Sequence, residues 1–97
     1  MAIVDLLRLA GVPLGKDLRG DRMLTYLVVE ATDSYRVVFA LPEIDPAFTE
    51  RTILLVDRHD HQPLSPHDGP LQVIVPGEKR HARKVRQVTA FTIRRAG

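Results

Sequence analysis

The apolar residues follow a helical spacing in only one stretch of the chain, at its N-terminus. Within residues 3–10 they recur every three or four positions, as on one face of a helix, at Ile3, Leu6, Leu7 and Ala10. Gly11 follows directly, and glycine is the usual residue at the left-handed position that ends a helix. We therefore expect a short amphipathic helix here.

The rest of the hydrophobic pattern predicts extended structure. Five segments are rich in β-branched and aromatic residues, which favour strands: 23–31, 35–44, 52–57, 71–76 and 85–95. Residues 32–34 (TDS) read as a hairpin turn between the first two. Alternation in the second segment places Tyr35, Val37 and Phe39 on one face. The continuous apolar run in 52–57 is typical of a central strand covered on both faces.

This order of elements predicts the fold class. A helix followed by five strands with short connections and no crossover helix indicates an α+β domain. We expect a mainly antiparallel or mixed sheet of about five strands, or a small barrel, with the helix at the N-terminus. A chain of 97 residues with ordinary globular composition predicts a single domain, residues 1–97.

Charge is distributed unevenly along the chain. Residues 1–76 hold seven Lys and Arg against eleven Asp and Glu, a net charge of −4, whereas residues 77–97 hold seven against one, a net charge of +6. Five of the basic residues fall within one short stretch, the basic segment (residues 79–86): Lys79, Arg80, Arg83, Lys84 and Arg86. Such a concentration favours an anionic partner.

Two interpretations of the basic segment stay open on charge alone. In one, two or three guanidinium groups point together and bind a phosphate, which the planar Arg fork contacts bidentately. In the other, the side chains only solvate a loop. The alternative function is a small basic module for nucleic acid or an acidic protein partner. Nucleic acid is the less favoured partner, because the aromatic residues occupy mostly strand or core positions and offer no stacking platform.

The sequence contains no recognised catalytic or metal-binding motif. It has no cysteine, so thiolate ligands and cysteine nucleophiles are excluded. His59, His61 and His67 lie close together, but their spacing matches no metal motif, and a solvated turn is favoured over a metal site. Whether the protein is an enzyme stays open.

Several stretches resemble the C-terminal half of the molybdopterin-binding domain of the sulfite oxidase family, especially its small bacterial members. They are LLRLAGVP, YRVVFALPEIDPAF and, most specifically, the DGP-strand-VPG-basic loop-strand sequence of residues 68–93. The resemblance implies an α+β fold that holds a molybdenum pterin cofactor. It also implies that basic residues after the VPG bind the cofactor phosphate; by position these are Arg83 and Arg86, with Lys79 and Arg80 nearby.

The chain departs from that family in one respect that bears on activity. Active members ligate the metal through a cysteine upstream of the matched part, and no cysteine exists here. We expect a truncated, oxidoreductase-like domain that lacks redox activity alone but retains an anion-binding loop. Asp5 and Arg8 interrupt the N-terminal apolar residues, so no signal peptide is expected. As written, the chain is expected in the cytoplasm and not in a membrane, although relatives are often exported.

Overall fold

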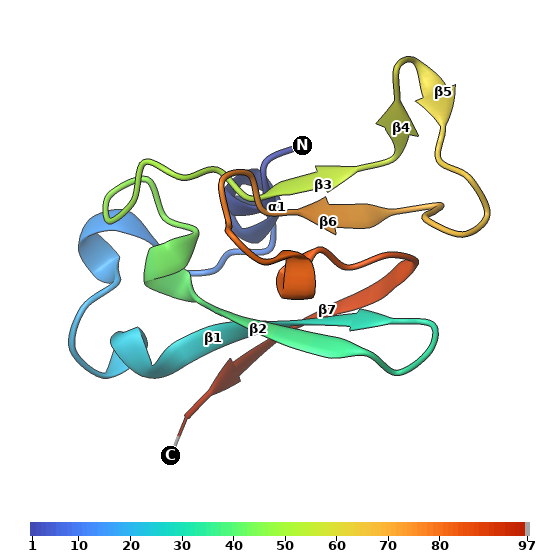
Figure 1. Cartoon of the computed structure of the whole chain (residues 1–97). Helices are drawn as coiled ribbons and strands as arrows, with labels where there is room; N and C mark the ends of the chain where they lie inside the picture. The colour runs from blue at the N-terminus through green and yellow to red at the C-terminus, as the bar shows by residue number, and fades with distance from the viewer. Residues whose placement is uncertain (97) are drawn as a thin grey trace.

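Two antiparallel sheets and one helix surround the core of the protein (Figure 1). The computed structural model describes residues 1–96. The regular elements are α1 (Ile3–Leu9), β1 (Thr25–Ala31), β2 (Arg36–Ala40), β3 (Leu54–Val56), β4 (Arg58–His59), β5 (Gln62–Pro63), β6 (Gln72–Ile74) and β7 (Val88–Arg95). Four 3-10 turns connect them: η1 (Gly15–Asp17), η2 (Gly20–Leu24), η3 (Leu41–Glu43) and η4 (His81–Arg83).

The larger sheet has the strand order β2-β1-β7, with both pairs antiparallel. Leu27 lies opposite Phe39 on one neighbour and Ile93 on the other, so the three side chains share one face. That face contributes to a core whose buried members come from nearly every element: Ile3, Val4, Leu7, Leu18, Leu27, Val29, Ala31, Val37, Phe39, Leu41, Ile44, Ile53, Val73, Val75, Val85 and Val88.

The smaller sheet consists of β3 and β6 and is widened by two isolated bridges. Ala2 bridges to Leu54 on one side, and Val85 bridges to Val73 on the other. Four segments of the chain, from both ends and the middle, therefore lie side by side. The β4–β5 hairpin projects from the end of this sheet (Figure 1).

The chain passes from the smaller sheet to the larger one between Val85 and Val88. The Val85 N–H donates to the Val73 carbonyl at 3.0 Å, and the Val88 N–H donates to the Leu71 carbonyl at 2.9 Å. Between them the Gln87 carbonyl accepts from the Thr32 N–H at 3.1 Å, at the turn between β1 and β2. Gln87 has a positive φ of 52°, which changes the direction of the chain here.

A buried carboxylate fixes the connection after β2. Asp45 is only 2% exposed and its two carboxylate oxygens accept backbone N–H groups, from Gly15 at 2.5 Å and from Ala47 at 2.9 Å. The chain turns twice around this residue, with η3 before it and a helical turn after it. The stretch LPEIDPAF thus has a structural role in anchoring η1 to η3.

The predicted α+β class, with a short N-terminal helix and antiparallel sheets, is confirmed. All five predicted strands exist, as do the helix and the turn at 32–34. The strands fall into two sheets because the passage at Val85–Val88 divides them, and no single five-stranded sheet forms.

Two details of the sequence prediction are wrong. The strand in 52–57 is not covered on both faces, since all three residues of β3 are half-buried. Residues 58–63, for which the sequence indicated only a solvated turn and no strand, form the β4–β5 hairpin. Its turn residues Asp60 and His61 both have positive φ, the conformation of a tight two-residue hairpin turn, without the glycine that usually signals it.

Replacing Phe39 by alanine tests the location of the core. Phe39 is fully buried on the core-facing side of β2, so Phe39→Ala is expected to lower the free energy of unfolding by about 3 to 5 kcal/mol. Val38→Ala is the control, because Val38 is the neighbouring residue of the same strand on the opposite, open face and is 50% exposed. Urea unfolding followed by circular dichroism measures both variants, and equal losses would contradict this description of the core.

Candidate anion-binding site

The bridge between Val85 and Val73 determines which way the basic residues point. Both valines are fully buried in the core. Side chains alternate between the two faces of an extended segment, so Lys84 and Arg86, on either side of Val85, turn outward. Arg83 ends η4, and its ion pairs with Glu43 and Glu78 hold it inward. The exposed side-chain fractions agree, at 25% for Arg83 and 54% for Arg86.

Arg83 is the centre of a local ion-pair cluster with Glu43 and Glu78. Its Nη1 lies 2.8 Å from Glu43 Oε1, and its Nε and Nη2 donate to the two carboxylate oxygens of Glu78 at 3.1 and 3.3 Å. Nη1 also donates to the Val38 carbonyl at 3.2 Å. The guanidinium carbon lies 4.5 Å from the centre of the Phe39 ring, in cation–π geometry.

The protonation of Arg83 reflects two opposed effects. Burial lowers the pKa of the guanidinium, whereas the hydrogen bonds to Glu78 and Glu43 and the charges of those carboxylates raise it. The net pKa lies above its usual value, so Arg83 remains a cation. With two carboxylates already bound to it, Arg83 ties η3 to the basic segment and has its charge neutralised locally.

Lys84 and Arg86 line a shallow space on the other side of the segment, the loop concavity. Its volume is ≈ 250 Å³, and the turn between β1 and β2 forms the opposite wall; the lining residues are Ala31, Asp33, Tyr35, His81, Ala82, Lys84 and Arg86. The Tyr35 hydroxyl donates to the Ala82 carbonyl and so closes the rim. The concavity therefore brings two cations and an imidazole together.

The cations of the loop concavity differ in their existing partners. Arg86 Nε lies 3.3 Å from Asp68 Oδ1 in a pair that is about half exposed. Lys84 makes no ion pair with any of residues 1–96. Asp33 is the one carboxylate in the lining, and its Oδ1 accepts from the Tyr35 N–H at 3.0 Å. Lys84 is thus the cation most available to a ligand.

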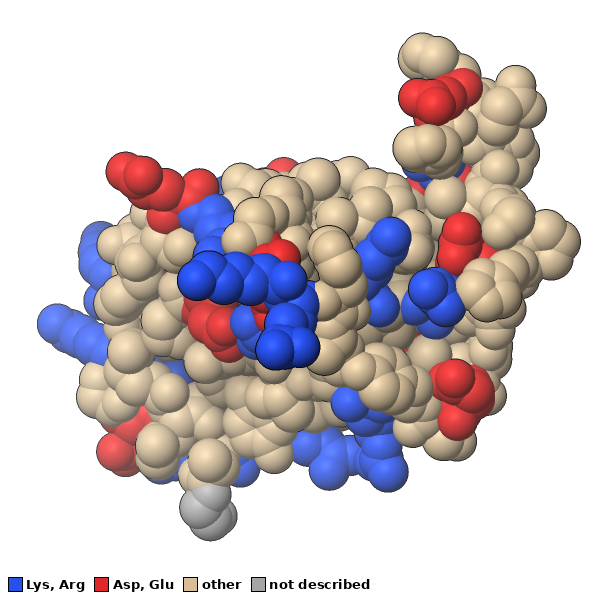
Figure 2. Space-filling view, in the orientation of Figure 1, with Lys and Arg blue, Asp and Glu red and all other residues tan. Residues whose placement is uncertain are grey.

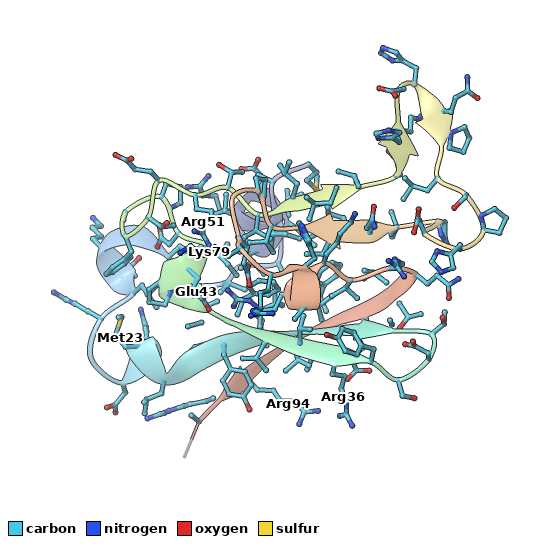
Figure 3. The ribbon with its side chains drawn as sticks, in the orientation of Figure 1. Met23, Arg36, Glu43, Arg51, Lys79 and Arg94 are labelled. Carbon is cyan, nitrogen blue, oxygen red and sulfur yellow. The ribbon has the colours of Figure 1, made fainter. Side chains whose placement is uncertain are left out.

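The four residues predicted to bind a cofactor phosphate do not converge on one space. Arg83 faces Glu43 and Glu78, and Arg86 lines the loop concavity. Lys79 and Arg80 are exposed and are not among the residues that line this concavity. In Figure 3 the Lys79 side chain lies in the same part of the view as Glu43 and Arg51.

The charged residues on the surface are likewise divided into separate groups. Figure 2 shows Lys and Arg in several separate groups, and the central group encloses carboxylates. Sequence reasoning gave Lys84, His81 and Tyr35 no place in a site. The alternation around Val85 in RKVRQ could have indicated that Lys84 points outward. The approach of Tyr35 to Ala82 depends on the fold and leaves no signal in the local sequence.

The histidines are held apart at the surface. His59 pairs with Asp60 at 3.3 Å and His67 with Asp68 at 3.2 Å, and their side chains are 84% and 73% exposed. Within residues 1–96 no three His, Asp or Glu side chains are grouped so that they could hold a metal ion. His59, His61 and His67 are all exposed to solvent.

The chain matches no protein-family model, no curated protein and no solved structure. The resemblance to the sulfite oxidase family therefore stays a prediction. No helix within residues 1–96 has the length and apolar character needed to cross a membrane.

Removing Arg83 tests its structural role. Arg83→Ala leaves Glu43 and Glu78 without their shared cation, and we expect the free energy of unfolding to fall by about 1 to 3 kcal/mol. Arg80→Ala removes an exposed cation three residues away and is expected to change it by less than about 0.5 kcal/mol. Urea unfolding of both variants provides the measurement. Wild-type stability of Arg83→Ala would show that the cluster is not structural.

Proposed function

We propose that this domain binds the phosphate group of a small organic ligand in the loop concavity. Lys84 and Arg86 supply the charge, and His81 supplies a further hydrogen-bonding group. The pterin phosphate of a molybdenum cofactor, expected from the resemblance to the sulfite oxidase family, is the candidate ligand.

The observation that carries this proposal is the position of Lys84. Its ammonium lines a concavity with a second cation, yet no carboxylate of residues 1–96 pairs with it. Ligand pockets that enclose a whole organic molecule measure roughly 300 to 1,000 Å³. The ≈ 250 Å³ of the loop concavity supports a role in holding an anionic group, with the rest of the ligand outside it.

The residues fit the phosphate of the cofactor and do not fit its metal. Two cations and an imidazole lining one space suit a phosphate dianion. Arg83, a candidate by position, is already bound to two carboxylates and is left out of the proposed site. The chain contains no cysteine to ligate molybdenum, so the proposal is limited to binding and includes no redox step.

The chemistry assigned to the site is electrostatic. The Lys84 ammonium donates hydrogen bonds to phosphate oxygens, and the Arg86 guanidinium, held by Asp68, presents its planar fork from a fixed direction. The Tyr35–Ala82 hydrogen bond keeps the two walls together. Asp33 faces the same space, which disfavours a large number of negative charges on the ligand.

Titration with inorganic phosphate at constant ionic strength tests the proposal. We expect the backbone amide NMR signals of Tyr35, His81 and Lys84 to shift together, since these residues line one space. Lys84→Gln is expected to weaken phosphate binding about tenfold or more, because a hydrogen bond between charged groups is lost.

Lys79→Gln is the matched control, since it removes an exposed lysine of the same segment that lies outside the concavity. It is expected to bind phosphate like the wild type. Equal weakening in both variants would instead indicate diffuse attraction to the basic segment. Steeply salt-dependent retention of an oligonucleotide, without a localised phosphate response, would favour the nucleic-acid alternative.

A further inference from the structure

The outer face of the smaller sheet carries a second and larger cavity, the sheet cavity. Val56 lies opposite Gln72 and Leu54 opposite Ile74, so these four side chains share the face turned away from the core residue Val73. The β4–β5 hairpin and residues 62–68 rise beside this face. The cavity between them has a volume of ≈ 630 Å³, within the range of small-molecule sites.

Gln72 is a largely buried polar side chain beside the sheet cavity. It is only 5% exposed, lines the sheet cavity, and its side-chain amide makes no hydrogen bond to any of residues 1–96. No buried side-chain nitrogen or oxygen without a partner is sealed from solvent, so the amide reaches the cavity. Buried polar side chains in native proteins nearly always have a partner, so water or a ligand in the cavity is the available partner of the Gln72 amide.

The charges around the sheet cavity favour an anion at its rim. Arg58 and Lys84 both line it, and neither is paired with a carboxylate of residues 1–96. Of the two acidic residues in the lining, Asp68 is paired with Arg86, and Asp60 is 89% exposed to solvent at the turn of the β4–β5 hairpin. Val56, Leu64 and Ile74 provide apolar walls between these polar ends.

We infer that the sheet cavity binds a small amphipathic carboxylic acid with a second polar group, such as a short-chain oxo acid. The carboxylate is held at the rim by Arg58 and Lys84, and the carbon chain packs on Val56 and Ile74. The Gln72 amide donates to the second polar group. This site is independent of the loop concavity except for Lys84, which lines both.

Three probes of similar size separate the contributions of the negative charge, the carbon chain and the second polar group to binding. Pentanoate carries the charge and the carbon chain, 4-oxopentanoate adds a carbonyl, and pentylammonium reverses the charge. We expect both acids to shift the amide NMR signals of Val56, Gln72 and Ile74, and pentylammonium to leave them unchanged. The oxo acid is expected to bind about three- to tenfold more tightly than pentanoate, the usual effect of one hydrogen bond.

Gln72→Leu keeps the size of the side chain and removes its amide. It is therefore expected to abolish the difference in affinity between 4-oxopentanoate and pentanoate. Arg58→Ala, at an exposed position where folding is not at risk, is expected to weaken both acids by a similar factor and to leave phosphate binding in the loop concavity unchanged. Arg51→Ala is the control, because it removes an exposed arginine that lies outside the sheet cavity.

Either of two results would overturn the inference. One is equal binding of pentylammonium and pentanoate, or signals that shift only outside the sheet cavity. The other is an oxo-acid preference that survives in Gln72→Leu. A Lys84→Gln variant that loses phosphate binding and still binds 4-oxopentanoate more tightly than pentanoate would show that the two sites are separate.

Discussion

The antiparallel bridge between Val73 and Val85 is the constraint on which the functional surface depends. It joins the smaller sheet to the segment that enters β7, so the two sheets enclose one core. Burial of Val85 also fixes the direction of the residues on either side, because neighbouring side chains of an extended segment point to opposite faces. The outward positions of Lys84 and Arg86 both follow from this single contact.

Local sequence patterns were sufficient for the helix and the five main strands, because each has a clear hydrophobic period. Patterns within one segment could not predict which side chains from distant segments contact it. The partners of Arg83, for example, include Glu43, forty residues earlier in the chain. The β4–β5 hairpin was missed because His61 occupies the second turn position with a positive φ, where glycine is the usual residue. Tyr35 enters the candidate site only through pairing of β1 with β2.

Charge density along the sequence overstated the field that this surface presents. Residues 77–97 carry a net charge of +6, but Arg83 is bound to two carboxylates and Arg86 to one, and most of these acids come from earlier in the chain. Folding thus distributes acidic residues of the first three quarters among basic residues of the last. What remains is a small number of individually placed cations, which favours a discrete ligand over a long polyanion.

Lys84 is shared between the loop concavity and the sheet cavity. One ammonium group offers three hydrogens and a single charge. An anion bound on one side therefore reduces the hydrogen bonds and the electrostatic attraction available to an anion on the other side. Under the two binding proposals, occupants of the two spaces are therefore expected to be antagonists through this side chain. The reduction is equal in both directions, because coupling between two binding equilibria is reciprocal. On these proposals, a lysine that lines both spaces would make the domain responsive to the ratio of two solutes.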